Sequence, residues 1–485
     1  MKLKKLIGVL AVAGLAMPGI ASATNGYFAH GYGMKSKGMA GSGIAMPQDA
    51  MAAATNPAGM VWVGNRIDFG ADVFKPVRGT TINSTAFPGP PGGFGTGEYS
   101  GNGDSIFLIP EFGYNMMFGQ DASIGIVVYG NGGMNTSYED LNARTTGFGF
   151  GVNAAIYGFG APVAPACLLP AAFGGPADNT GTGAGGTTAT CPVDTSNGVF
   201  GAGKVGVDLI QLFVAPTYAM KVTPDHSLGV SLNLVYQQFK ADGLHNFVPF
   251  SAAGANLTNI GYDKSTGYGL KFGWTGKISS TVMMGATYQT ETKMRKFDKY
   301  RGLFAEQGGF DIPETYGLGI AVKATPAVTI AADIQQINYS KVRSVANSID
   351  NLILGVGGPL GANNGAGFGW QDMTVFKLGM DYQFDKNLVL RGGFSTNRQP
   401  IPSRETAFNV LAPGVIENHL TLGATWTLAN KDEVTVGYMH GFKKTVSGVR
   451  TDAATPGTPL AAFGNGMDLR MHQDSIGIAY GWKMM

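Results

Sequence analysis

From about residue 65 onward the chain repeats one pattern, in which apolar residues alternate with small or polar residues over about ten positions. In 420–428, for example, Leu420, Leu422 and Trp426 alternate with small or polar residues. Successive side chains of a β-strand point to opposite faces, so a period of two predicts strands with one apolar face. A strand that crosses a bilayer, with lipid on one side and a lumen on the other, has this pattern.

A water-soluble β-sandwich would also alternate, but three features favour a membrane barrel. The predicted strands have about ten residues, whereas strands of soluble domains have about five or six. Short turns alternate with long loops along the chain, and aromatic residues gather at strand ends. An open sheet edge would leave unpaired backbone groups in hydrocarbon, so the sheet must close. The predicted strands lie near 65–79, 104–118, 122–138, 206–222, 227–241, 264–279, 281–298, 312–324, 327–342, 371–384, 387–400, 417–429, 433–446 and 471–485.

Composition excludes several other classes of protein. Only 14% of the residues are charged, whereas soluble domains have about 25%. The formal net charge of +2 gives no electrostatic reason to expect nucleic-acid binding. After residue 23 no apolar run approaches the roughly 20 residues of a membrane-spanning helix.

The first residues have the pattern of a secretory signal. Residues 2–5 include three lysines, residues 6–16 are an apolar run, and Ala21-Ser22-Ala23 matches a small-residue cleavage site. The apolar run is too short for a membrane anchor. We predict a signal peptide over residues 1–23.

Residues 24–64 do not alternate and are small, nearly uncharged and rich in glycine, alanine and methionine. A barrel of about fourteen strands has a bore too wide for its own wall side chains to fill. The low charge argues against the alternative of a disordered tail. The sequence therefore predicts an all-β fold, a transmembrane antiparallel β-barrel over 65–485 with 24–64 as a plug, or hatch, inside its lumen.

Cys167 and Cys191 lie in one loop rich in glycine, alanine and proline. A disulfide between them suits an oxidising compartment, and the alternative is two unpaired thiols. No paired histidines and no CxxC accompany them, so we predict no metal site. Nothing in the sequence indicates a cofactor.

Two adjacent predicted strands contain residues that weaken strand pairing. Pro110 lies in the middle of the second strand and has no N–H for the ladder. The third strand contains Gly130, Asn131, Gly132 and Gly133, and so many glycines permit a bulge or kink. The alternative is an ordinary bend of the barrel wall.

Several segments together resemble the FadL-type outer-membrane transporters, the family of long-chain fatty-acid and aromatic-hydrocarbon channels that includes TodX-like proteins. The resemblance covers essentially the whole chain after the signal. Its segments are 38–43 with 49–50, 56–60, 284–290, 310–313, 331–334, 369–372, 390–393, 400–402 and 436–438.

The resemblance implies roles for particular residues. Asn56, Pro57 and Ala58 match the motif of the family's hatch, and a turn there would hold the plug. Tyr27 and Phe28 correspond to N-terminal residues that help to form the family's apolar pocket. The glycine-rich segment of the third strand corresponds to the family's strand-three kink, which opens a lateral gap in the wall.

Other candidate ligand-binding residues come from side-chain chemistry. Met34, Met39 and Met46 could line an adaptable pocket, or could simply pack the plug. Alternation places Lys271, Lys377 and Arg391 on the lumen face, where each could pair with a carboxylate head group or form a salt bridge within the protein. The predicted ligand-binding residues are Tyr27, Phe28, Met34, Met39, Met46, Lys271, Lys377 and Arg391.

These observations predict a transporter rather than an enzyme. Its substrates would be hydrophobic compounds, either long-chain fatty acids or aromatic hydrocarbons, captured in an apolar pocket and released sideways after rearrangement of the hatch. The alternatives are a passive porin for small hydrophilic solutes, an adhesive surface barrel and an enzyme with a Ser/His pair on the rim. We expect a monomer in the outer membrane of a Gram-negative bacterium, in contact with its lipid and lipopolysaccharide.

Overall fold

The computed structural model describes residues 25–83, 95–145, 198–450 and 464–484. The predicted signal peptide, residues 1–23, and the predicted disulfide between Cys167 and Cys191 lie outside these ranges. Within them, no helix has both the length and the apolar character needed to cross a bilayer.

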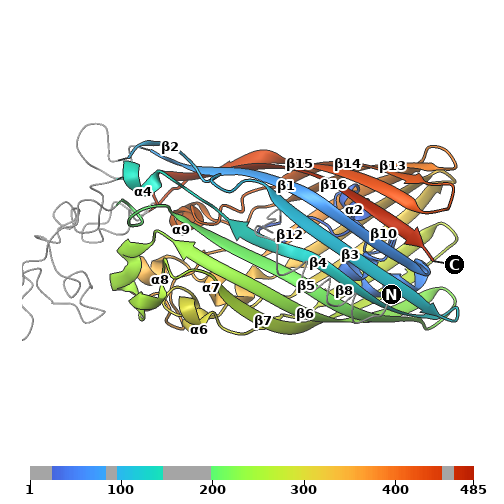
Figure 1. The fold of residues 1–485 in the computed structure, drawn as a ribbon, viewed down its shortest axis with the longest axis horizontal. Coiled ribbons are helices and arrows are strands. Elements are labelled where there is room, and N and C mark those ends of the chain that lie inside the picture. Colours follow the sequence, from blue (N-terminus) through green and yellow to red (C-terminus); the bar gives the residue numbers. More distant parts are fainter. Residues whose placement is uncertain (1–24, 84–94, 146–197, 451–463, 485) are drawn as a thin grey trace, which may run out of the picture.

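The strands of the described residues form one antiparallel sheet that closes into a barrel (Figure 1). The first strand, β1 (Arg66–Ile82), pairs along its whole length with the last, β16 (Met467–Lys483). Two strands, β2 (Gly97–Ser100) and β9 (Lys293–Met294), are short additions to a wall of fourteen. The other wall strands are β3 (Phe107–Phe118), β4 (Ala122–Asn135), β5 (Gly206–Lys221), β6 (His226–Asp242), β7 (Asp263–Lys277), β8 (Val282–Gln289), β10 (Thr315–Thr325), β11 (Val328–Ile337), β12 (Met373–Gln383), β13 (Leu388–Asn397), β14 (Asn418–Thr427) and β15 (Glu433–Val446).

The predicted strands and the observed wall strands agree one for one, so the predicted barrel is confirmed. The largest differences occur where strands enter the long loops. The strand predicted over 281–298 ends at Gln289, and only Lys293–Met294 beyond it pairs again, with β7. The strand predicted over 327–342 ends at Ile337, because Tyr339–Lys341 and Arg343–Ala346 form the short helices η7 and α7. Alternation continues past the end of the ladder there, so periodicity alone does not locate the boundary.

The wall has the predicted two faces. On β12, Phe376, Leu378 and Met380 are exposed on the outer surface, while Val375 and Lys377 are buried. The outward side chains form the surface that lipid covers, and the inward ones meet the plug or the cavities.

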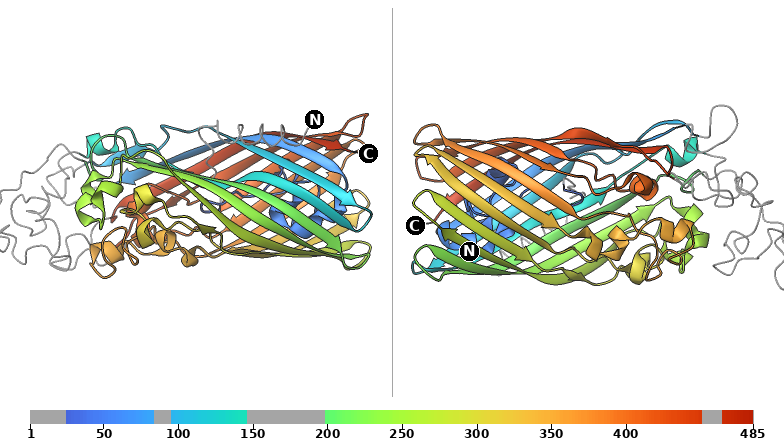
Figure 2. Two further views of the ribbon diagram at one scale, coloured as in Figure 1. Left: turned by 60° about the horizontal axis from the view of Figure 1, so that its bottom comes forward. Right: turned by 180° about the vertical axis from the view of Figure 1, so that it is seen from behind.

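The two ends of the barrel differ, as the side views show (Figures 1 and 2). Tight turns join the strands at the end near the C-terminus, and the long connections with their short helices gather at the other end. Long loops of such barrels face the outside of the cell. The helices in these connections are α4 (Leu141–Arg144), η4 (His245–Phe250), η5 (Gly254–Asn256), η6 (Asp298–Tyr300), α6 (Ala305–Gly308), η7, α7, α8 (Asp350–Ile353), η8 (Ser403–Glu405) and α9 (Thr406–Asn409).

Residues 25–64 fill part of the bore, which confirms the predicted plug. Its helices are α2 (Met34–Lys37), α3 (Ala52–Thr55) and η1 (Pro57–Trp62). Helix α2 lies against β14, β15 and β16, whereas η1 lies against β5, β6 and β7. The plug therefore contacts both sides of the wall.

Asn56 and glycines of the wall hold η1 close to the strands. The Asn56 side chain accepts a hydrogen bond from Ala58 N at 3.1 Å, which caps η1. It also donates to Trp274 O at 2.9 Å on β7. A Cβ atom on Gly273 would lie 1.9 Å from Asn56 Oδ1, and one on Gly229 would lie 2.4 Å from Ala58 N. Only glycine permits this approach, which gives part of the chain's high glycine content a structural role.

Candidate functional site

A partly open apolar cavity of about 490 Å³ lies at the long-loop end, and we call it the outer cavity. No lining side chain is ionisable. The one lining hydroxyl, that of Ser344, donates to Gly309 O at 2.5 Å and is therefore already occupied. The cavity suits a ligand without charge. Its aromatic lining consists of Phe239, Phe247, Phe304, Phe368 and Phe408.

A cluster of aromatic rings connects the outer cavity to the plug. Tyr27 packs against Tyr339 at 5.1 Å and against Phe310 at 6.1 Å between ring centroids. Phe310 lies 4.8 Å from the outer-cavity residue Phe304. Tyr339 OH donates to Asn25 O at 2.5 Å, which fixes the start of the plug. The two residues predicted for the pocket, Tyr27 and Phe28, therefore lie within this cluster, with their rings 5.3 Å apart.

A second cavity, enclosing about 360 Å³, lies against β1, β4 and β16, and we call it the side cavity. Its lining is mostly apolar and includes Phe74, Met134 and Trp370. One chain segment separates the two cavities, because Phe408 and Leu411 line the outer cavity while residues 412–414 line the side cavity.

Polar contacts hold that separating segment to the neighbouring long loop. Glu405 accepts hydrogen bonds from Ser348 Oγ at 2.6 Å and Ile349 N at 2.9 Å. Burial raises the pKa of the Glu405 carboxyl. Asp350 pairs with both Arg404 and Arg450. Polar contacts therefore fix the segment at residues 404–405, while residues 408–414, which separate the cavities, are mostly apolar.

The wall beside the side cavity has an interruption in its hydrogen-bond ladder. Pairing between β3 and β4 runs from Phe118–Ala122 only as far as Glu111–Tyr129. Both strands continue beyond that pair, β3 along β1 and β4 along β5. We call the unpaired stretch between residues 103–110 and 130–136 the window. It contains Pro110 and the glycine-rich segment, at the place where the sequence predicts a lateral gap.

The plug bridges the two edges of the window from inside. On the β4 side, Ala29 N donates to Asn131 O at 2.8 Å and Gly133 N donates to Tyr27 O at 3.0 Å. On the β3 side, Met34 N donates to Glu111 Oε1 at 3.0 Å. On the β4 side, residues 27–29 therefore take up backbone hydrogen bonds that the missing ladder leaves free, whereas on the β3 side the Glu111 carboxylate holds the plug.

Close packing allows this bridge only because residue 132 is glycine. A Cβ atom there would lie 1.7 Å from Tyr27 O. A cavity of about 380 Å³ lies between the bridge and the wall, with Pro110, Tyr129 and Gly130 in its lining. Phe74 lines both this cavity and the side cavity, so the two are neighbours.

Buried ion pairs hold the rest of the plug. Lys35 Nζ lies 2.6 Å from Glu433 Oε2. Lys37 Nζ lies 3.0 Å from Asp72 Oδ2 and 3.4 Å from Glu111 Oε2. Breaking such a pair by removing one partner costs about 3–5 kcal/mol. These contacts oppose movement of the whole plug.

The structure places the three predicted cations on the inner face, each in contact with the plug. Lys271 donates to Ala54 O, and Lys377 donates to His30 O at 3.0 Å. Arg391 donates to Gln48 Oε1 at 3.0 Å and lies 3.1 Å from Asp381. Lys271 and Lys377 also line a polar cavity of about 500 Å³. Their binding of a head group stays a prediction.

The three predicted methionines lie between the plug and the wall. Met34 and Met39 are buried, and Met46 packs at the edge of the Met39 cluster. None of the three lines the cavities described above. Their role as pocket residues stays a prediction.

The sequence analysis did not single out the outer cavity, Tyr339 or Arg78, and it used Trp370 only within the segment 369–372 that carries the family resemblance. These residues come from loops or strand ends that are far apart in the chain, and no spacing rule connects them. A count of aromatic residues in the long loops would have drawn attention to the loops, although not to the cavity.

A family model described as outer membrane protein transport protein (OMPP1/FadL/TodX) matches residues 186–483, which is more than half of the chain. The chain belongs to this family. It is therefore an outer-membrane protein of a FadL/TodX-type transport family rather than an enzyme, as the sequence predicted. No curated protein matches the chain in sequence.

Solved structures of FadL/TodX-type proteins share the fold at low identity. The Pseudomonas putida toluene transporter TodX is 15% identical, with a TM-score of 0.60, over 94% of this chain and 99% of TodX. A Pseudomonas aeruginosa FadL homologue is 13% identical, with a TM-score of 0.62, over 95% of this chain and 100% of its own. The Ralstonia pickettii toluene transporter TbuX is 15% identical, with a TM-score of 0.57, over 94% and 99%.

Proposed function

We propose that this FadL/TodX-type protein carries neutral hydrophobic compounds, of the hydrocarbon class, into the outer membrane. The observation that carries the proposal is the outer cavity, whose lining has no ionisable side chain. Burial of a hydrocarbon there gains roughly 0.8 kcal/mol per CH₂ group. A carboxylate would lose its hydration without a partner, which is costly.

The descriptions of the solved relatives are compatible with a neutral hydrocarbon substrate, although they do not select it over a fatty acid. TodX and TbuX are described as toluene transporters, and another similar structure is described as a FadL homologue. Fold similarity at this identity does not select between a hydrocarbon and a fatty acid. The uncharged lining of the outer cavity supports the hydrocarbon.

We infer a route that ends in the membrane rather than in the periplasm. A ligand would leave the outer cavity past the aromatic cluster, enter the side cavity and pass between β3 and β4 through the window. The Lys35–Glu433 and Lys37–Asp72 pairs anchor helix α2 of the plug to the wall. The rearrangement of the hatch is therefore confined, in this proposal, to residues 25–32.

Uptake of labelled toluene and labelled oleate tests the proposal. The protein is produced in cells that lack their own transporter, and empty cells serve as the baseline. We expect toluene uptake well above the baseline and oleate uptake near it. Strong oleate uptake without toluene uptake would overturn the choice of a neutral substrate.

A charge placed in the outer cavity provides a sharper test. Leu360 lines this cavity and is 2% exposed. We expect Leu360→Lys to lower toluene uptake about tenfold or more, since the ammonium group makes the cavity polar. Oleate uptake should rise, because the lysine can pair with its carboxylate. Val356 is 74% exposed in the same loop, so Val356→Lys is a matched control. It should change the uptake of neither toluene nor oleate.

A passive porin for hydrophilic solutes is the second candidate, and the plug argues against it. An open pore would give a steady ion current in a planar bilayer. We expect the wild-type protein to give little current, because residues 25–64 fill part of the bore and contact both sides of the wall. The predicted monomer and its contact with lipopolysaccharide belong to this proposal as expectations.

A further inference from the structure

The window is closed at its outer end as well as at its inner end. Beyond it, the segment before β3 pairs with the segment after β4, through a bridge between Asn102 and Ser137. Ser137 N donates to Gly101 O at 3.0 Å, and Gly103 N donates to Ser137 O at 3.0 Å. The ladder interruption therefore has two fixed ends, the Glu111–Tyr129 pair and this bridge.

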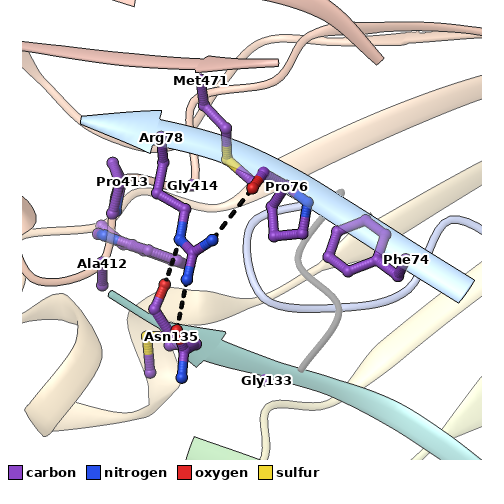
Figure 3. A pocket seen from close by; sticks show the side chains of 11 residues that line it. Phe74, Pro76, Arg78, Gly133, Asn135, Ala412, Pro413, Gly414 and Met471 are labelled. Atoms are coloured by element: carbon purple, nitrogen blue, oxygen red, sulfur yellow. Dashed lines mark hydrogen bonds between the residues drawn. The ribbon is translucent and has the colours of Figure 1, made fainter. Parts of the chain in front are cut away.

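The side chain of Arg78 lies directly inside the outer end of the window. Arg78 is on β1, and its guanidinium reaches Asn135 at the end of β4 (Figure 3). Nε donates to Asn135 O at 2.7 Å, and Nη2 donates to the Asn135 side chain. Nη2 also donates to Asp104 O at 2.6 Å, and Nη1 donates to Pro76 O at 3.0 Å. One side chain thus joins both edges of the window to β1.

The contacts of Arg78 differ in chemistry from those of the buried cations Lys35, Lys37 and Arg66. Lys35, Lys37 and Arg66 each pair with a carboxylate. Arg78 is 2% exposed, yet within the described residues no carboxylate lies within ion-pair distance of it. All its acceptors are neutral oxygens. The planar fork of a guanidinium can hold several carbonyls in fixed positions at once, which an ammonium group cannot do.

The surroundings of Arg78 place it beside the route of the ligand. Arg78, Phe74 and Met471 line the side cavity together (Figure 3). A ligand in that cavity lies against Phe74, which also lines the cavity behind the window. Arg78 holds the segments around Asp104 and Asn135, which form the outer end of the window that this ligand would pass.

We propose that Arg78 is a positioning residue that fixes the outer edge of the window and so limits the cross-section of the molecules that pass. This inference rests on the proposed lateral route. Hydrogen bonds to a charged donor are stronger than those between neutral groups, so the edge stays closed while the glycine-rich part of β4 can move. A substitution at Arg78 should then change the uptake of wide substrates more than the uptake of narrow ones.

Uptake of two neutral hydrocarbons of different width tests the inference. Labelled toluene and labelled phenanthrene are compared in cells that produce wild type, Arg78→Met or Arg78→Lys. We expect Arg78→Met to raise the ratio of phenanthrene to toluene uptake about tenfold, since the hydrogen bonds that hold Asp104 and Asn135 are lost. Arg78→Lys keeps one such bond and should give an intermediate ratio.

Arg470 provides a matched control. It is a partly buried arginine on β16 at the same end of the barrel and donates to Thr80 O at 3.3 Å and Thr81 Oγ1 at 2.7 Å. It does not contact the window, so Arg470→Met should leave the ratio at the wild-type value. Heat-modifiable migration in gels verifies that each variant forms a barrel, and Arg78→Lys retains the test if Arg78→Met does not fold.

The outcomes separate this inference from the proposed function. If folded Arg78→Met and Arg78→Lys both keep the wild-type ratio while toluene uptake persists, the positioning role is wrong and the route can still be lateral. If wild type takes up neither hydrocarbon, the proposed function itself is wrong. A rise in the ratio that Arg470→Met reproduces would also contradict the inference, because the effect would then be general loosening of the barrel.

Discussion

A disulfide between β3 and β4 at the inner end of the window should lower toluene uptake about tenfold or more. Positions 110 and 130 come directly after the last ladder pair, Glu111–Tyr129. The double substitution Pro110→Cys and Gly130→Cys therefore places two cysteines at the next position of the same register. Replacement of the proline also restores an N–H group to β3.

The size of this effect follows from the need of the ligand to separate β3 from β4. One added ladder pair makes parting the strands harder by about 1 kcal/mol, and the covalent bond cannot part at all during transport. The variant is made with Cys167→Ser and Cys191→Ser, so that only one disulfide can form. Uptake is measured in oxidised cells and again after a membrane-permeant reductant, which should restore it.

A second cysteine pair provides the control. Met116 and Ile124 are opposite each other in the part of the β3–β4 ladder that is already paired, and both are exposed on the outer wall. A disulfide between Met116→Cys and Ile124→Cys should leave uptake unchanged. Unchanged uptake in the oxidised 110–130 variant would exclude the window as the exit and would favour a path through the plug.

The barrel and plug could be predicted from the sequence because their signals are local. Each wall strand shows its period of two within about ten residues, and the plug lacks that period while being small, apolar and nearly uncharged. The position of the window could also be predicted, since Pro110 and Gly130 to Gly133 weaken pairing through their own backbone chemistry.

The cavities and the contacts of the charged residues could not be predicted in the same way. Lys35 and Glu433 are 398 positions apart in the sequence, and only the closed barrel brings them together. Alternation places Lys271, Lys377 and Arg391 on the inner face but does not say which plug atoms they meet. Arg78 has no distinguishing neighbour in the sequence, and its importance appears only from the three segments that it joins.

Glu433 is the residue whose loss should most disturb the plug. Its carboxylate receives Lys35 of the plug at 2.6 Å, Arg66 of β1 at 2.9 Å and Lys483 of β16 at 2.7 Å. We expect Glu433→Gln to lower the free energy of unfolding by about 3–5 kcal/mol, because Lys35 and Arg66 would stay buried with less compensation. Unfolding of the purified protein in detergent with guanidinium measures this change.

The same substitution should also open the bore to ions. With Lys35 released, α2 loses its charged link to β15, so we expect steady single-channel current in a planar bilayer where wild type gives little. Glu417 pairs with Lys444 at 2.5 Å, a partly exposed pair between β15 and the segment before β14 that does not involve the plug, so Glu417→Gln serves as the matched control. Its current should stay at the wild-type level, and equal currents in the two variants would mean that Glu433 does not anchor the plug.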